Sequence, residues 1–181
     1  IVDWKQPMKK VKIGKGEQLK AGKDLAVITI GTMAHSAARA IEKVERENEI
    51  SIAHYDMRFL KPLDTEMLHE IASNFKQIVT IEDGVINGGF GSAVLEFMAD
   101  NNYKLNVKRL GINDTFVEHG TPEQLYNMLG LDTEGIAKSL LEYINIQKHK
   151  IDFELCNNAM LKNNYLNVQQ GDYLVNLFEH V

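Results

Sequence analysis

The sequence predicts a three-layer α/β/α domain around a mostly parallel sheet of about five strands. Short apolar runs rich in β-branched residues, such as Leu25–Ile30, alternate with segments whose apolar residues recur at helical spacing, such as Ala34–Val44. A Gly-rich segment, Gly84–Gly91, follows one of these runs and leads into another helical segment. Strands and helices that alternate in this way form parallel βαβ units with helices on both faces of the sheet.

The individual elements follow in order. The continuous apolar run over residues 25–30 predicts a strand buried on both faces, and further strands are expected over residues 50–55, 77–81 and 107–112. Helical spacing predicts helices over residues 34–44, 64–72 and 91–98, a fourth from residue 121 and a fifth from residue 132 to residue 144. Asp64, Thr121 and Asp132 precede three of these helices and are suited to be N-caps, and Pro122 suits a first helical position.

Composition divides the chain into three parts. Residues 1–23 are polar and basic, and we expect an arm or an edge strand there. Residues 24–147 form the predicted α/β domain. Residues 148–181 begin with three basic residues that interrupt the helical pattern, are rich in Asn, and form an extension of unknown role, with short helices expected at 152–163 and 171–180. The first residue is not Met, so we expect the chain to be a fragment or a processed piece.

Composition also excludes several classes of protein. The apolar share of 44% and the charged share of 25% are those of a globular domain, and the net charge of -5 argues against nucleic-acid binding. The one cysteine, Cys156, excludes an internal disulfide and a cysteine-based zinc cluster and fits a cytoplasmic location. No run approaches the ~18 apolar residues of a membrane span, so no membrane partner is expected.

The Gly-rich segment is the first candidate site. Glu82 and Asp83 end a predicted strand, and in parallel sheets ligands bind at the carboxyl ends of strands. Gly88 and Gly89 would let backbone amides at a helix start approach a phosphate or a carboxylate. The alternative is a tight connection in which the glycines permit helix–sheet packing and the two acids discourage an anion. The glycine spacing matches neither the Rossmann fingerprint nor the P-loop, which favours the second interpretation.

Two further loops carry candidate residues. Arg58 follows a strand and could grip a carboxylate or phosphate, or it could be paired with Asp56 or Glu82 to fix the loop. His119 could act as an acid or base near neutral pH, but a loop histidine bonded to a backbone group or to a neighbouring subunit is favoured. No residue is assigned a catalytic or cofactor-binding role. No metal site is predicted either, because no pair of histidines has the spacing of a helix-borne zinc site.

Five motifs together resemble one known family. They are Gly31-Thr32, Asp56-x-Arg58-Phe59-x-Lys61-Pro62-Leu63-Asp64, Glu82-Asp83-Gly84 with Gly88-Gly89-Phe90-Gly91-Ser92, Gly111-Ile112-x-Asp114-x-Phe116-Val117-x-His119-Gly120, and Gly130-Leu131-Asp132-x-x-Gly135-Ile136. In order and spacing they resemble the carboxy-terminal domain of the transketolase superfamily. Within it, they are most similar to the 1-deoxy-D-xylulose-5-phosphate synthase family. The resemblance covers roughly residues 8–145.

The resemblance implies a function for the parent enzyme. Members of this family are dimeric transferases of three domains that condense pyruvate with glyceraldehyde 3-phosphate, with release of carbon dioxide, and supply isoprenoid, thiamine and pyridoxal synthesis. They use thiamine diphosphate and Mg²⁺, which the first two domains hold. The segments that bind the cofactor and grip the substrate phosphate have no counterpart in this sequence. The resemblance therefore implies a third domain with a structural and dimer-interface role, inactive without its N-terminal catalytic domains.

Two alternatives remain open at this stage. The chain could be a regulatory module that holds an anion at the helix start near Gly88. It could also be the matching domain of a 2-oxo-acid dehydrogenase β subunit, which docks onto an acyltransferase core. If the chain is instead the third domain of such a synthase, we expect the isolated domain to expose apolar surface and to self-associate.

Overall fold

The computed structural model describes residues 10–162. In chain order the elements are β1 (Glu17–Lys20), β2 (Leu25–Thr29), α1 (Met33–Glu47), β3 (Ile52–Asp56), α2 (Thr65–Asn74), β4 (Gln77–Val85), α3 (Phe90–Asp100), β5 (Asn106–Ile112), α4 (Pro122–Leu129) and α5 (Thr133–Lys162). Internal contacts divide the chain into two units, Ile1–Leu141 and Glu142–Val181, with the boundary inside α5. The first unit contains the whole sheet.

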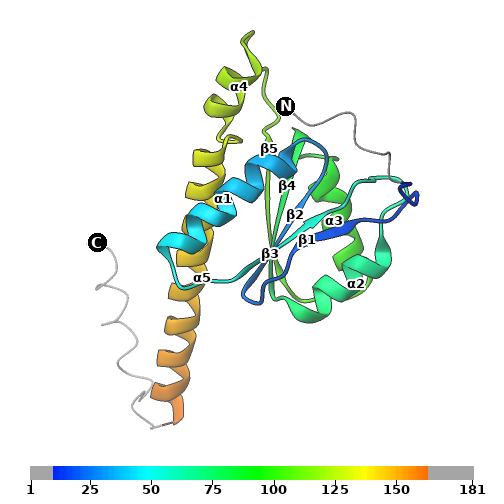
Figure 1. Ribbon diagram of the computed structural model, residues 1–181. Helices are drawn as coiled ribbons and strands as arrows, with labels where there is room; N and C mark the ends of the chain where they lie inside the picture. Colours follow the sequence, from blue (N-terminus) through cyan, green and yellow to red (C-terminus); the bar gives the residue numbers. More distant parts are fainter. Residues whose placement is uncertain (1–9, 163–181) are drawn as a thin grey trace. The chain divides into compact units, whose positions relative to one another are not determined.

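The five strands form one sheet in the order β1-β3-β2-β4-β5 (Figure 1). Neighbouring strands β3, β2, β4 and β5 run parallel; for example, Val27 of β2 pairs with His54 of β3 on one side and with Val79 of β4 on the other. Strand β1 pairs with β3 antiparallel and forms an edge. The mostly parallel sheet of about five strands that the sequence predicts is therefore confirmed.

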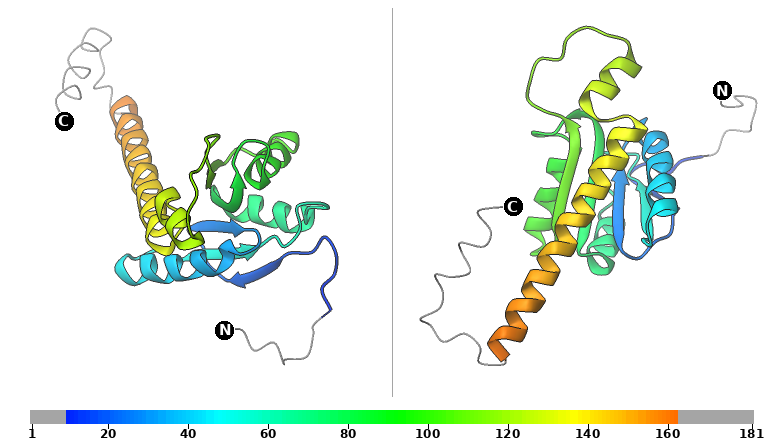
Figure 2. Two further views of the ribbon diagram at one scale, coloured as in Figure 1. Left: turned by 90° about the horizontal axis from the view of Figure 1, so that it is seen from above. Right: turned by 90° about the vertical axis from the view of Figure 1, so that its left-hand side faces the viewer.

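Helices cover both faces of the sheet (Figure 2). On one face, α2 and α3 pack over β-strand residues such as Ile28 and Ile78, and Tyr55 meets Phe75 edge-on with ring centroids 6.4 Å apart. On the other face lie α1, which buries Ala37 and Ile41, and the first turns of α5. All five residues of β2 are buried because this strand is central and covered on both sides.

The helix ends confirm the predicted caps. The Asp64 side chain accepts from the amide of Met67 at the start of α2, and Asp132 accepts from the amide of Gly135 at the start of α5. Thr121 and Gln124 form a reciprocal capping box at the start of α4. These contacts satisfy amides that the first turn of a helix leaves without partners.

One polar pair lies inside the core. His54 on β3 is 1% exposed, and its Nε2 lies 3.0 Å from the hydroxyl of Thr29, which itself donates to the carbonyl of Tyr55. Because the single hydroxyl proton of Thr29 is used in that bond, the ring nitrogen of His54 donates to the Thr29 oxygen. Burial, with a smaller contribution from Lys20, lowers the pKa of His54 to about 4, so the ring is neutral near pH 7.

The edge strand expected within residues 1–23 lies at Glu17–Lys20, where it pairs with β3. One detail differs from the predictions. The interruption expected at residues 148–150 is absent, since α5 continues to Lys162. Lys is a good helix former, so Lys148 and Lys150 do not by themselves end a helix. The helix expected at 171–180 lies outside the described residues, and the boundary at residue 147 stays a prediction.

Candidate functional site

Every residue singled out from the sequence lies at the carboxyl edge of the sheet. Arg58 follows β3, Glu82 and Asp83 lie near the end of β4, Gly88 and Gly89 connect β4 to α3, and His119 lies in the loop after β5. Since β3, β4 and β5 are parallel, their carboxyl ends meet at one edge (Figure 1). The sheet brings these loops to one edge, although within it the residues contact different partners.

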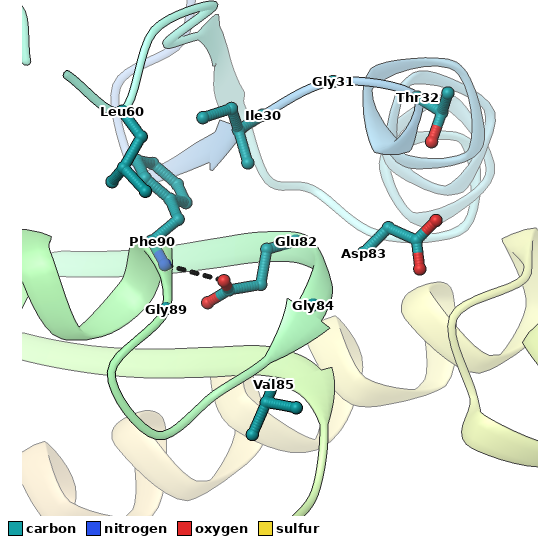
Figure 3. Close-up of a pocket in the computed structure, with 10 residues that line it drawn as sticks. All are labelled: Ile30, Gly31, Thr32, Leu60, Glu82, Asp83, Gly84, Val85, Gly89 and Phe90. Atoms are coloured by element: carbon teal, nitrogen blue, oxygen red, sulfur yellow. Dashed lines mark hydrogen bonds between the residues drawn. The ribbon is translucent and has the colours of Figure 1, made fainter. Parts of the chain in front are cut away.

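The Glu82 carboxylate is the anion at the Gly-rich turn. It is 5% exposed, and its two oxygens accept the amides of Phe90 at 2.6 Å and of Gly91 at 2.8 Å (Figure 3). These amides belong to the first turn of α3, where the helix dipole favours a negative charge. The position that an external phosphate would take is therefore filled by a side chain of the protein itself.

The glycines of the turn make room for that carboxylate and for α3. A Cβ at Gly89 would lie 2.2 Å from a carboxylate oxygen of Glu82, and one at Gly91 would lie 2.7 Å from the hydroxyl of Thr80. Gly88 has φ of 76°, a left-handed conformation that glycine adopts without strain. The predicted tight connection with close helix–sheet packing is thus what the geometry displays.

A second set of bonds, which the sequence analysis missed, locks the same turn. The Arg109 guanidinium on β5 donates to the carbonyl of Ile86 at 2.6 Å and to the hydroxyl of Ser92 at 2.9 Å. The Ser92 hydroxyl also donates to Ile86 and accepts the amide of Gly88 at 3.0 Å. Ser92 was visible as the last residue of the Gly-rich motif, but Arg109 lies inside strand β5 next to Lys108, and no motif distinguished it.

Arg58 has a strained backbone and acidic neighbours. Its φ is 59°, which is uncommon for a residue other than glycine, and the Asp56 side chain accepts its amide at 3.0 Å. Its guanidinium binds the Glu17 carboxylate and lies 3.9 Å from that of Asp56. The predicted pairing with Asp56 is confirmed, whereas Glu82 is not a partner, because both of its oxygens face the start of α3.

Asp83 joins the sheet to α4. Its side chain points to the opposite face from Glu82, as alternation along a strand requires, and it accepts the phenol of Tyr126 at 2.6 Å. The bond to this carboxylate raises the pKa of Tyr126. Tyr126 was not among the predicted residues, because nothing in the sequence connects a tyrosine on α4 with the end of a strand 43 residues earlier.

The loop after β5 is exposed. His119 lies at the surface, and the neighbouring Phe116 is 108% exposed, the highest value among the large apolar side chains described. The contact of His119 with a backbone group or another subunit stays a prediction.

Two hollows lie along the carboxyl edge. One, of about 410 Å³, is lined by Glu82, Asp83 and apolar side chains that include Ile30, Leu60 and Val85 (Figure 3). The other, of about 340 Å³, lies between residues 60–63 and the start of α3. Leu60 is 37% exposed and Val85 44% exposed, so the edge presents apolar side chains to whatever covers it.

The residues of this edge do not fit a diphosphate–metal group. The helix-start amides already hold the Glu82 carboxylate, and a bound diphosphate would face two acidic side chains. Within residues 10–162, no three His, Cys, Asp or Glu side chains gather closely enough to hold a metal ion. In the same range, no helix combines the length and the apolar character needed to cross a membrane.

Comparisons with known proteins agree on one family. The family described as "Transketolase, C-terminal domain" matches residues 14–136. A 1-deoxy-D-xylulose-5-phosphate synthase of Phocaeicola vulgatus is 57% identical over 143 residues, which are 79% of this chain and 23% of that protein. The synthase of the same name from Porphyromonas gingivalis is 42% identical over 136 residues, which are 75% of this chain and 21% of that protein.

A solved structure described as "Split gene transketolase, inactive beta4 tetramer" matches with a TM-score of 0.68 and 34% sequence identity. The match covers 74% of this chain and 43% of the chain in that structure. This chain thus spans less than a quarter of the length of the curated relatives it matches. The matched region contains the whole sheet and every residue of the carboxyl edge described above. The chain belongs to the transketolase C-terminal domain family.

Proposed function

We propose that this chain serves as the third domain of a thiamine-diphosphate-dependent 1-deoxy-D-xylulose-5-phosphate synthase. The main support is the identity of 57% to a relative of that name, over a region that is only 23% of the relative. In this proposal the parent enzyme condenses pyruvate with glyceraldehyde 3-phosphate. The cofactor, which the other domains of the enzyme bind, supplies the carbanion chemistry. The chain itself is a structural domain and inactive alone.

The carboxyl edge supports a structural role. Three of its charged groups have internal partners: Glu82 holds the start of α3, Arg58 binds Glu17, and Arg109 holds the turn. A carboxylate that already accepts two amides is poorly placed to transfer protons. Such an edge is suited to hold a neighbouring domain in a fixed position, and small errors of placement at an active site lower rates strongly.

The proposal includes a homodimeric parent enzyme in the cytoplasm. The solved relative is described as a tetramer of β chains, which supports the capacity of this type of domain to take part in assemblies. Mg²⁺ and thiamine diphosphate belong to the parent enzyme in this proposal, since the donor set of the carboxyl edge does not fit them.

The two alternatives have weaker support. An anion-binding module needs free amides at the start of α3, and Glu82 already occupies those of Phe90 and Gly91. A domain that docks an acyltransferase core belongs to the same superfamily, but the curated relatives reported above carry the synthase name.

A domain exchange tests the proposal. Residues 14–136 replace the matching region of the Phocaeicola vulgatus synthase, and formation of 1-deoxyxylulose 5-phosphate is measured with thiamine diphosphate and Mg²⁺. We expect turnover within about tenfold of the natural enzyme, and none from the isolated chain. The unaltered synthase is the control for the assay. Robust turnover by the isolated chain, or an exchanged enzyme that does not assemble, would overturn the proposal.

A further inference from the structure

Residues 113–129, named here the β5–α4 segment, consist of a largely exposed loop and of helix α4, which lies at the surface. Helix α4 has a capping box at its start, Pro122 at its first position and Gly130 in a left-handed conformation at its end, yet none of its eight residues is buried. Helices this short are marginal in water unless an apolar face packs against another surface. Met128 of this helix is 60% exposed.

The loop ahead of α4 carries the most exposed aromatic side chain of the described residues. Phe116 is 108% exposed, on a loop that projects beyond the end of β5 with α4 beside it (Figures 1 and 2). A single exposed apolar residue is ordinary, but a fully exposed aromatic ring next to a surface helix that also exposes Met128 is typical of an interface anchor.

Polar contacts hold this segment in place. Tyr126 donates to Asp83 at 2.6 Å, and the Asn127 amide donates to Asp132 at 2.9 Å. Both bonds lie at the surface, and both orient α4 without burying it. The segment is therefore positioned by the domain while Phe116 and Met128 stay exposed.

Charge indicates what kind of surface covers the segment. Residues 113–129 contain three acids, Asp114, Glu118 and Glu123, and neither Lys nor Arg. A second copy of this chain would bring the same acids against them in a symmetric contact, and like charges facing each other disfavour such a pair. The complementary partner has an apolar pocket with Lys or Arg around its rim.

We propose that the β5–α4 segment docks onto the catalytic remainder of the synthase, with Phe116 in an apolar pocket that basic side chains surround. This inference rests on the proposed function. The occupant is that remainder because more than three quarters of the length of each curated relative lies outside this chain, whereas self-pairing meets charge repulsion. The contact then fixes the domain on the body of the enzyme.

The test compares one substitution in two settings. Phe116→Ser is made in the isolated chain and in the enzyme that carries residues 14–136 in the Phocaeicola vulgatus synthase. In the isolated chain we expect no change in Tm, because the ring is fully exposed. In the exchanged enzyme we expect faster limited proteolysis between the domains, by about tenfold, and a lower Tm. The matched control is Leu19→Ser, on the β1 edge, where Leu19 is 46% exposed. This substitution should change Tm by the same amount in the isolated chain and in the exchanged enzyme.

A second variant tests whether the acidic side chains of the β5–α4 segment contribute to docking. Asp114→Asn with Glu118→Gln should make the Tm of the exchanged enzyme less sensitive to salt and leave the isolated chain unchanged. If Phe116→Ser has the same effect in both settings, the docking inference is wrong, although an active exchanged enzyme still supports the proposed function. If Phe116→Ser instead abolishes self-association of the isolated chain, the occupant is a second copy and the inference is overturned. An exchanged enzyme that does not assemble would overturn both the docking inference and the proposed function.

Discussion

At the scale of single residues, Glu82 explains why a Gly-rich turn at a helix start need not bind a ligand. Amides at the start of α3 attract an anion wherever they are free, and here the protein supplies the anion from the preceding strand. The acid in Glu82-Asp83-Gly84 was visible in the sequence as a group that would repel a phosphate. Its direct contact with α3 depends on β4 carrying it to the correct face.

Removal of this carboxylate gives a first prediction. Glu82→Ala leaves the amides of Phe90 and Gly91 buried without partners, so we expect a loss of about 2–4 kcal/mol in the free energy of unfolding. Urea denaturation measures it. Acetate or phosphate in the buffer should restore part of the loss, and should not affect the exposed control Glu96→Ala. A loss below about 0.5 kcal/mol would show that the amides find other partners.

The buried His54 leads to a prediction about how the stability of the fold depends on pH. Its pKa is about 4 in the folded chain and ~6.5 in an unfolded one, so the unfolded state takes up a proton first as pH falls. The stability that comes from a neutral His54 is complete above pH ~6.5 and is lost progressively towards pH ~4, by about 3 kcal/mol in total. Comparison with His54→Gln isolates this contribution, because carboxylates titrate equally in both proteins. Parallel pH profiles for the two proteins would contradict it.

At the scale of elements, α3 is placed by close contact with the sheet. Its first turn approaches β4 and β5 at Gly91, where a Cβ would lie 2.7 Å from Thr80 and 2.8 Å from Arg109. Side chains on both strands are themselves packed, so neither can give way freely. The helix position, and with it the Glu82 contact, depends on the absence of a side chain at residue 91.

Gly91→Ala should therefore displace α3. We expect a loss of about 1–3 kcal/mol in the free energy of unfolding, as for other overpacked sites. Gly84→Ala is the matched control, because a Cβ there meets a single atom at 3.4 Å. Equal stabilities of the two variants, measured by urea denaturation, would show that α3 can shift without penalty.

Helix α5 shows where local patterns were misread. The basic residues at 148–150 were interpreted as the end of the helical pattern, yet the helix runs from Thr133 to Lys162. Lys has a high helix propensity, and a change of composition is not a helix stop signal unless Gly, Pro or a capping residue accompanies it. Helix α4 shows the converse, because its capping box and Pro122 located its start correctly from the sequence.

At the scale of the whole molecule, apolar side chains at the carboxyl edge lead to a prediction about association. Leu60 and Val85 are exposed there. We expect the isolated chain to self-associate weakly, with a weight-average mass that rises with concentration in sedimentation experiments. A clean monomer over a hundredfold range of concentration would contradict this. Phe116→Ser should leave the association unchanged, because the acidic β5–α4 segment disfavours pairing with itself.

The sequence by itself determined the order of strands and helices, the parallel sheet, the N-caps and the position of the candidate residues at one edge. These features depend on periodicity and capping, which are local along the chain. Only the tertiary structure decided which groups meet there: Glu17 with Arg58, Arg109 with Ser92, and Tyr126 with Asp83. Strand order and register bring these partners together across 41, 17 and 43 residues, and no local pattern encodes contacts over such separations.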